Sequence, residues 1–382
     1  MVKVGILSDT HFGFSWGTAR EDESFSQAAD AIEKLLKEGV DFIILAGDVF
    51  HVPAPPPEIW SRAIDVLSIA KRQESNLKAA RSSKPVSRLC LQGTPIVAIH
   101  GTHERRARKA DTALETLEKV GLVIHLHADT ITFEKDGERI AVHGLSGVPE
   151  KYTRDALKDW SPKLVPGARN ILVLHQNIFP FVYSKDESAG IQLADLPEGF
   201  DLYIDGHIHT PILTNYGESP VIISGSTVLT QMKKGEQGEK FCWLYDGKVR
   251  QIPISTRPFF YVEVKADNDT PTELQKKIDD MVLKFPKDSL VKIKITGRLK
   301  AGYTSADLSF SPKSQAIISI DRDFETEESL PESRPLTETA VSLLSSKLRE
   351  MGFKSSVDIS RLYDLLVEGR LDEAAKLVEE GT

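Results

Sequence analysis

Short runs of consecutive apolar residues recur along the first half of the chain and predict buried β-strands. These runs are residues 2–7, 42–46, 95–99, 171–174 and 201–205. Between them, residues 21–38 and 58–80 carry apolar side chains at the three- and four-residue spacing of amphipathic helices. Strands of nearly continuous hydrophobicity that alternate with helices are typical of a sheet covered on both faces. The pattern therefore predicts a layered α/β domain.

Three later apolar runs belong to the same domain. They are residues 221–224, 241–245 and 249–254. The last two runs are separated by Asp246-Gly247, a pair typical of β-hairpin turns. We therefore expect antiparallel strands at this point and assign residues 1–255 to the first domain.

A second, smaller domain is predicted after the break at Thr256-Arg257-Pro258. Its predicted strands are residues 259–264, 290–295 and 315–320. A helix between the first two strands opens with Thr270-Pro271-Thr272-Glu273, which is a capping box with proline in the first turn. The acidic residues 321–335, rich in serine and proline, are typical of an exposed linker. Residues 256–335 are therefore predicted to form a small α+β domain with its linker.

The last part of the chain, residues 336–382, is predicted to be a helical tail. It contains three short segments with an apolar stripe, separated by Gly352 and Gly369. Their apolar surface is too small for an independent domain, so we expect the tail to pack on the rest of the chain or on a partner.

The composition is that of a globular protein, because 40% of the 382 residues are hydrophobic and 27% are charged. The chain has no run of 18 apolar residues and its first residues lack a signal-peptide pattern. Two cysteines, Cys90 and Cys242, are too few for a disulfide framework. We therefore expect no membrane partner and a cytoplasmic location.

The net charge of −8 would argue against a nucleic-acid partner if it were evenly spread. However, residues 321–382 carry 15 acidic and 8 basic side chains, so the rest of the chain is almost neutral. What matters for DNA is a local basic face opposite the phosphates, and the charge of the whole chain does not exclude one.

Six of the ten histidines follow directly after predicted strands. The motifs are Asp9-Thr10-His11, Gly47-Asp48-Val49-Phe50-His51, Gly101-Thr102-His103-Glu104, His175-Gln176 and Gly206-His207-Ile208-His209. The carboxyl ends of strands in an open α/β sheet form a single ligand-binding edge. One histidine in such a place is usually a buried structural residue, but five motifs in register indicate a common site.

Carboxylates and imidazoles gathered at one edge suit Mn, Fe or Zn ions. Two such ions need a bridging ligand, for which Asp48 is the candidate, and together they would clamp the two oxygens of a phosphoryl displacement. The pattern therefore predicts a dinuclear metal centre.

These motifs resemble those of the calcineurin-like metallophosphoesterase superfamily and, within it, the DNA double-strand-break repair nucleases of the meiotic-recombination-eleven or SbcD type. The histidine three residues after Asp48, His51, resembles the motif of the nuclease branch of this superfamily. The order of a large domain, a small domain and a helical tail is similar as well, so the resemblance spans most of the chain. It implies a layered metallophosphoesterase sandwich whose small domain caps the active site.

The resemblance also implies a role for each motif residue. One metal would be held by Asp9, His11, Asp48 and His209, and the other by Asp48, His175, His207 and Thr102. His103 would stabilise the phosphate or protonate the departing oxygen. His51 would help to position the phosphate or the ligands, or would only support them by hydrogen bonds. The resemblance implies two divalent ions, with manganese expected first.

One residue departs from the family pattern, in which asparagine stands where this chain has Thr102. A hydroxyl is a shorter and poorer neutral donor than an amide oxygen. We therefore expect a weaker second metal site, unless a small shift of the loop lets the hydroxyl bind.

A basic cluster directly follows the same motif. It consists of Arg105, Arg106, Arg108 and Lys109. A charge run is usually a solvated face. Its place beside the proposed phosphate site favours contacts with the DNA backbone, which would be salt-sensitive and independent of base sequence.

Two protein partners are implied by the resemblance. Helices at the carboxyl end of family members dock on the coiled-coil base of an SMC-like ABC ATPase of the Rad-fifty or SbcC type, and residues 336–382 would do so unless they belong to the capping domain. Family nucleases also form homodimers through helices of the nuclease domain. An apolar stripe available for such a contact, or for ordinary core packing, consists of Ile59, Ala63, Val66, Leu67 and Ala70.

The leading hypothesis is a manganese-dependent DNA nuclease with exonuclease and single-strand endonuclease activity, acting at the nucleoid in double-strand-break repair. One alternative is a phosphatase or phosphodiesterase of the same superfamily that acts on a small substrate. The other is a DNA-binding scaffold for the ATPase that cleaves weakly because Thr102 impairs the second metal site. The basic cluster favours DNA, and the presence of His103 argues against a complete loss of catalysis.

Overall fold

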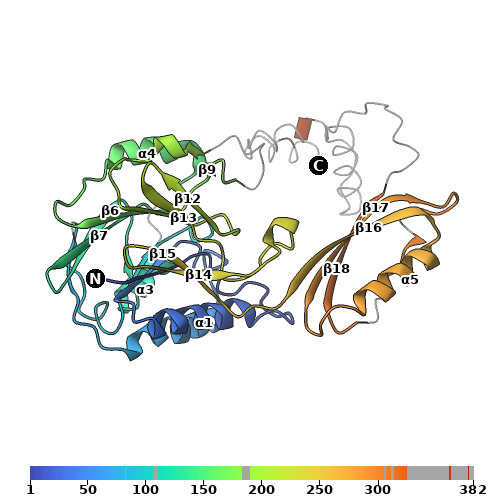
Figure 1. Cartoon of the computed structure of the whole chain (residues 1–382), viewed down its shortest axis with the longest axis horizontal. Coiled ribbons are helices and arrows are strands. Elements are labelled where there is room, and N and C mark those ends of the chain that lie inside the picture. Colours follow the sequence, from blue (N-terminus) through green and yellow to red (C-terminus); the bar gives the residue numbers. More distant parts are fainter. Residues whose placement is uncertain are drawn as a thin grey trace.

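The computed structural model describes residues 1–81, 83–105, 111–182, 190–304, 307–310, 314–324, 361–362 and 377. Figure 1 shows a larger part with two stacked sheets, followed by a smaller part with one sheet and one long helix. The chain passes from the larger to the smaller part at residues 254–258.

The first sheet of the larger part has six strands. In spatial order they are β15 (Val249–Pro253), β14 (Phe241–Tyr245), β1 (Val4–Leu7), β2 (Phe42–Ala46), β4 (Ile96–Ile99) and β5 (Ile124–His125). The four strands from β1 to β5 are parallel, whereas β14 and β15 form an antiparallel hairpin. The hairpin predicted around Asp246-Gly247 is therefore confirmed.

The second sheet has seven strands. In spatial order they are β12 (Ile212–Tyr216), β13 (Ser219–Ile223), β11 (Leu202–Asp205), β8 (Arg169–Leu174), β7 (Glu138–Gly144), β6 (Asp129–Lys135) and β3 (Lys78–Arg81). Its four central strands, β13 to β7, are parallel, and the others are antiparallel to their neighbours.

The two sheets pack face to face, and helices cover their outer faces. A core of buried side chains that includes Ile6, Ile44, Val142 and Ile204 lies between the sheets. The helices α1 (Glu23–Lys37), α2 (Pro57–Ser68) and α3 (Ala113–Lys119) pack on the first sheet, and α4 (Thr153–Trp160) packs on the second. The short elements are β9 (Ile178–Phe179), β10 (Ile191–Gln192) and the 3-10 turns Ile69–Arg72, Glu150–Tyr152, Leu193–Asp195 and Lys234–Glu236.

The layered α/β fold with strands covered on both faces is confirmed. The predicted strands are divided between two sheets, and each sheet buries one face against the other and one face against helices. A strand buried on both faces reads as a continuous apolar run whichever kind of element covers it.

The helix predicted over residues 58–80 is wrong in its second half, because α2 ends at Ser68 and Lys78–Arg81 forms an edge strand. The polar stretch of sequence around Arg81 predicts a solvated helix or loop, but the guanidinium of Arg81 is buried and pairs with Glu118 and Asp129. The apolar stripe of the first half packs in the core. Its members Ile59, Ala63, Val66, Leu67 and Ala70 are all buried, so they do not offer a dimer surface.

The smaller part consists of three parallel strands with a helix on one face. They are β16 (Phe259–Asp269), β17 (Leu290–Leu299), β18 (Ile317–Phe324) and α5 (Pro271–Val282). The predicted capping box is present, because the Thr270 hydroxyl accepts from the backbone N–H of Glu273 and the Glu273 carboxylate accepts from that of Thr270. Residues 321–324 were predicted to be linker and instead continue β18, where they pair with β17.

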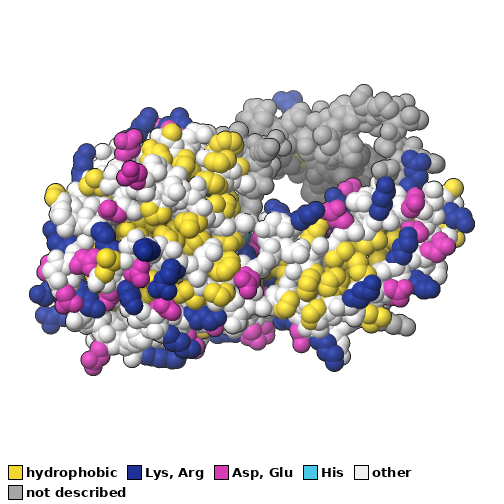
Figure 2. All heavy atoms as spheres, viewed as in Figure 1, with side chains coloured by type: hydrophobic (Ala, Val, Ile, Leu, Met, Phe, Trp, Pro, Cys, Tyr) yellow, Lys and Arg dark blue, Asp and Glu magenta, His cyan; other side chains and the backbone are white. Residues whose placement is uncertain are grey.

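Most of the predicted helical tail, residues 336–382, lies outside the described residues, and only Arg361, Leu362 and Leu377 of it are described. Among the described helices, none is both long enough and apolar enough to span a bilayer. Figure 2 shows acidic and basic side chains interspersed over one face of both parts, without a patch of a single sign on that face.

Candidate metal centre

The predicted site residues lie at the carboxyl ends of five parallel strands. Asp9 and His11 follow β1, Asp48 follows β2, and Thr102 follows β4 in the first sheet. His175 follows β8, and both His207 and His209 follow β11 in the second sheet. Because the two sheets are stacked, these ends meet at one edge of the sandwich. The structure thus brings together every metal ligand proposed from the sequence.

One group of potential ligand atoms belongs to Asp9, His11 and His209, and all of these atoms lie within 4.8 Å of one another. The two Nε2 atoms of the histidines are 3.2 Å apart, and Nε2 of His209 lies 3.6 Å from Oδ1 of Asp9. All three side chains are buried. Neighbouring nitrogen and carboxylate atoms at this spacing suit a divalent cation.

A second group consists of Asp48, His175 and His207, also within 4.8 Å. Nδ1 of His175 donates a hydrogen bond to the carbonyl oxygen of Ala46 at 2.7 Å, which turns Nε2 toward the centre, 3.3 Å from Oδ2 of Asp48. A backbone acceptor that fixes the tautomer of a histidine in this way is typical of metal ligands.

Neighbouring residues fix the position of the loop that carries Asp48. Oδ1 of Asp48 accepts from the backbone N–H of His103 at 2.8 Å. A side chain at Gly101 would clash, because its Cβ would lie 2.1 Å from that same Oδ1. Only glycine therefore allows the third motif to approach Asp48 this closely.

Four of the proposed ligands have a left-handed backbone conformation that is costly for residues other than glycine. They are Asp9, His11, Asp48 and His207, with φ of 51°, 45°, 46° and 71°. Such a conformation costs on the order of 1 kcal/mol or more per residue and persists only where the surrounding structure imposes it. Because four of the proposed ligands share this costly conformation, a functional site at this edge of the sheets is favoured.

The buried polar atoms fit a pair of cations. Oδ1 of Asp9 and Nε2 of His175 are both buried and have no hydrogen-bond partner. A buried polar atom without a partner costs about 1–3 kcal/mol, so natural proteins leave few of them. Both atoms face other proposed ligands, which is the arrangement expected of atoms that bind a metal ion.

The charges of these side chains also suit cations. Burial lowers the pKa of His11 to about 3 and that of His207 to about 4, so both rings are neutral at pH 7. Burial by itself would raise the pKa of Asp48, but the neighbouring histidines, above all His175, hold it well below its usual range. Burial likewise opposes protonation of His175, yet the charges of Asp48 and Asp9 outweigh it and raise its pKa to about 10.

His103 and His51 lie beside these two groups and, together with His11, form a third set of ring nitrogens within 4.8 Å of one another. Their rings stack with centroids 5.2 Å apart, and Nδ1 of His103 donates to the backbone carbonyl of His51 at 2.7 Å. Nε2 of His103 lies 3.9 Å from Oδ2 of Asp48, and 40% of its side chain is exposed. The second nitrogen of His103 thus lies next to the candidate metal site, on a side chain that is partly accessible to solvent.

Thr102 lies within the centre but makes a hydrogen bond to another ligand. Its half-buried hydroxyl donates to Oδ2 of Asp48 at 3.2 Å. The structure therefore places residue 102 next to the second group, while its role as a ligand stays a prediction.

Of the basic cluster, only Arg105 lies within the described residues, and Arg106, Arg108 and Lys109 lie outside them. Nε of Arg105 donates to the carbonyl of Thr102 at 3.4 Å, and its guanidinium lies 3.8 Å from the carboxylate of Glu150. This arginine is half-buried next to the centre.

Two buried carboxyl groups that support the centre were missed from the sequence. Glu104 accepts from the backbone N–H groups of Phe50 and Gly101, both at 2.7 Å, and so ties two ligand loops together. Asp205 accepts from the backbone N–H of Gln176 at 3.0 Å. Burial raises the pKa of each to about 8. The signal for Glu104 was its place at the end of the third motif, whereas Asp205 stood out only as an acid ending an apolar run.

Comparison with known proteins gives a consistent result. A family model described as calcineurin-like phosphoesterase matches residues 2–211. The chain is 30% identical over 321 residues to the "DNA double-strand break repair protein Mre11" of Thermoplasma acidophilum, with 79% of each chain covered. It is 24% identical to the protein of that name from Archaeoglobus fulgidus, covering 100% of this chain and 87% of the relative. The match to that of Methanopyrus kandleri is 30% identical and covers 55% of this chain but only 45% of the relative.

Proposed function

This chain belongs to the calcineurin-like phosphoesterase family and, within it, to the Mre11 type, and we propose that it is a metal-dependent nuclease that hydrolyses phosphodiester bonds of DNA in double-strand-break repair. The observation that carries the proposal is the pair of ligand groups, Asp9–His11–His209 and Asp48–His175–His207, with His103 beside them. Two metal sites and an adjacent acid are the parts that in-line hydrolysis of a phosphodiester requires.

Two divalent ions, manganese first among them, would bind the residues proposed from the sequence. One would be held by Asp9, His11, Asp48 and His209, and the other by Asp48, His175, His207 and Thr102. Bound ions of this kind acidify a water and neutralise charge on the phosphate. The mixture of carboxylate oxygens and neutral imidazoles supports manganese over magnesium, which prefers oxygen ligands.

His103 is the proposed general acid. Its Nδ1 hydrogen is fixed on the carbonyl of His51, so the proton available for transfer is the one on Nε2. When the P–O bond breaks, the electron pair stays on the departing sugar oxygen, and the Nε2 proton of the imidazolium neutralises it. His51 would orient this ring through its carbonyl and through stacking.

DNA would reach the centre past the basic cluster. Arg105 and, by sequence position, Arg106, Arg108 and Lys109 would contact backbone phosphates without reading the bases. We expect exonuclease and single-strand endonuclease activity, with the smaller part of the chain helping to present the DNA. The enzyme would work at the nucleoid with an SMC-like ATPase of the Rad50 type, and as a homodimer.

The test is cleavage of labelled single- and double-stranded DNA with manganese, with magnesium and with a chelator. Wild type is compared with His103→Ala and with His127→Ala, an exposed histidine that lies in neither ligand group. We expect manganese-dependent cleavage by wild type and His127→Ala and its loss in His103→Ala. Absence of cleavage by wild type, together with hydrolysis of bis-p-nitrophenyl phosphate, would instead indicate a small-substrate phosphodiesterase.

A further inference from the structure

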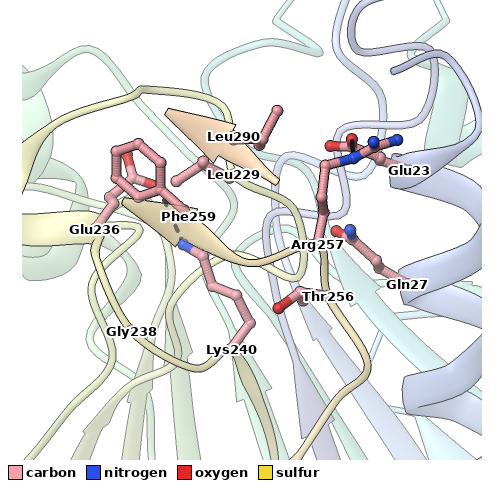
Figure 3. A pocket seen from close by; sticks show the side chains of 10 residues that line it. All are labelled: Glu23, Gln27, Leu229, Glu236, Gly238, Lys240, Thr256, Arg257, Phe259 and Leu290. Carbon is pink, nitrogen blue, oxygen red and sulfur yellow. Dashed lines mark hydrogen bonds and ion pairs between the residues drawn. The ribbon is translucent and has the colours of Figure 1, made fainter. Parts of the chain in front are cut away.

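The segment between β13 and β14, residues 224–240, lies between the metal centre and the smaller part of the chain. We call it the 224–240 loop. Thr230 and Lys240 of this loop contact His209, and Leu229 packs against the first residues of β16 and β17 (Figure 3). The two contacts are made by different residues of one continuous loop.

Lys240 joins this loop to the backbone of His209. Its side chain is buried, and Nζ donates to the carbonyl oxygen of His209 at 3.1 Å. The same ammonium donates to the hydroxyl of Ser226 at 2.9 Å and to Oε2 of Glu236 at 3.0 Å. All three donors of the ammonium are therefore used, and the carbonyl of His209 is held jointly by Lys240 and by the backbone N–H of Ser226, which donates to it at 3.2 Å.

The ring of His209 is contacted by the same loop. Oγ1 of Thr230 lies 2.6 Å from Nδ1 of His209. Oε1 of Glu236 lies 3.9 Å from that nitrogen and is buried without a hydrogen-bond partner. Groups that hold the second nitrogen of a histidine set the direction of the nitrogen that binds the metal.

The loop is also connected to the smaller part by a chain of charged side chains that begins at the carbonyl of Leu229. Arg20 donates to the carbonyl of Leu229 at 2.6 Å and to Oε2 of Glu23 at 2.7 Å. Oε1 of Glu23 accepts from Nε of Arg257 at 2.7 Å, and Nη1 of Arg257 donates to the carbonyl of Asp288 just before β17 at 2.9 Å. Glu23 thus links the loop to the smaller part through two arginines.

Apolar packing strengthens the same connection. Leu229 of the loop forms a buried cluster with Phe259 of β16 and Leu290 of β17. Figure 3 shows these side chains around a cavity, whose volume is about 10 Å³. Such a space holds nothing larger than a water molecule. The contacts around it therefore connect the loop closely to the smaller part.

We propose that the 224–240 loop couples the placement of the smaller part to the proposed metal ligand His209. Lys240 is the positioning residue beside His209, and the Glu23–Arg257 pair provides the positioning residues toward the smaller part. The proposal rests on the role of His209 in the proposed function. A change in the position of the smaller part relative to the larger part would move Leu229 and Arg20. The loop would transmit this movement to the groups that hold His209.

The experiment is titration of the metal-free full chain with Mn²⁺, with free ion followed by electron paramagnetic resonance. Wild type is compared with Lys240→Met, Arg257→Gln and Lys234→Gln. The last variant is the matched control, because Lys234 lies on the same loop and pairs with Glu263 of β16 at 3.2 Å, but its side chain is 75% exposed. Hydrogen exchange of the peptide that contains His209 is measured in parallel.

We expect Lys240→Met to weaken one of the two manganese sites about 10- to 100-fold, as is usual when a group behind a ligand is removed. Arg257→Gln, which touches no proposed ligand, should weaken that same site about 2- to 30-fold. Both variants should speed exchange around His209, while Lys234→Gln should match wild type. If Lys240→Met does not fold, Lys240→Met/Glu236→Leu removes both charges of the buried pair and takes its place.

Two results overturn the proposal in different ways. If both Arg257→Gln and Lys240→Met bind two manganese ions with wild-type affinity, and hydrogen exchange around His209 is unchanged, the coupling is refuted. The proposed nuclease function would not be affected by this result. Failure of wild type itself to bind manganese would refute the proposed function and the coupling with it.

Discussion

The backbone carbonyl of His51 accepts the Nδ1 hydrogen of His103 at 2.7 Å. The two residues are 52 positions apart in the chain and follow different strands, β2 and β4. Because this bond fixes the ring and its tautomer, Nε2 is the only ring nitrogen of His103 that is left to exchange a proton. The proposed acid role therefore belongs to this one atom.

The proposed role of His103 as a proton donor can be tested with a side chain of similar size that does not titrate. His103→Gln can put an amide near the position of Nε2 but cannot donate a proton of suitable acidity. We expect the rate of DNA cleavage to fall about 10²- to 10⁴-fold, while manganese binding stays as in wild type. Single-turnover cleavage measures the effect, with His127→Gln as the control. A rate within a few-fold of wild type would remove His103 from the acid role.

Metal binding should depend steeply on pH because of His175. Without metal its pKa is raised to about 10, so the ring carries a proton at pH 7, and a ligand nitrogen must be free of it. Binding therefore releases a proton, and affinity at that site should rise about tenfold per pH unit below this pKa. His11 and His207 are already neutral at pH 7 and add nothing to this dependence.

Calorimetry in two buffers of different ionisation enthalpy, between pH 6.5 and 8, gives the number of protons released. Release of about one proton per two ions bound is expected from His175. An affinity that does not change across this range would contradict the prediction.

Replacing Thr102 by asparagine should strengthen the second metal site. The present hydroxyl donates to Oδ2 of Asp48, whereas an amide oxygen at this position is a better neutral ligand. Manganese titration of Thr102→Asn should show tighter binding at one site and no change at the other. Identical stoichiometry and affinity in the two proteins would show that threonine already binds as well as asparagine.

Glu104 should contribute to stability although it touches no substrate. Its two oxygens accept from the N–H groups of Phe50 and Gly101, and glutamine can accept at only one of these places. We expect Glu104→Gln to lower the free energy of unfolding by about 1–3 kcal/mol, measured by urea denaturation without metal. Glu74→Gln, which changes an exposed carboxylate, is the matched control. Equal midpoints for the two variants would count against this role.

The basic cluster should set the salt dependence of DNA binding. On duplex DNA, the slope of log affinity against log salt becomes shallower by about 0.9 for every phosphate that the protein no longer neutralises. Replacing Arg105, Arg106 and Arg108 by glutamine should therefore reduce the slope by about 2–3, if each arginine neutralises one phosphate. Lys248→Gln, at the exposed β14–β15 turn, should leave the slope unchanged. An unchanged slope in the triple variant would exclude the cluster from DNA binding.

The amino-acid sequence by itself determined the features that depend on neighbouring residues. The apolar runs marked β1, β2, β4, β8 and β11, and the motifs that follow them predicted one metal site at a shared edge, while the resemblance to the family implied which of these residues are ligands. The capping box at Thr270 was equally visible, since its partners are three residues apart.

Only the tertiary structure decided the features that depend on distant parts of the chain. A strand buried on both faces has the same apolar pattern whether a helix or another sheet covers it, so the assignment of each strand to one of two sheets could not be read from that pattern. Arg81 looked like a solvated residue until Glu118 and Asp129 enclosed it. Lys240 and Arg257 belong to no motif, and they gain a role only because folding places one beside His209 and the other beside Glu23.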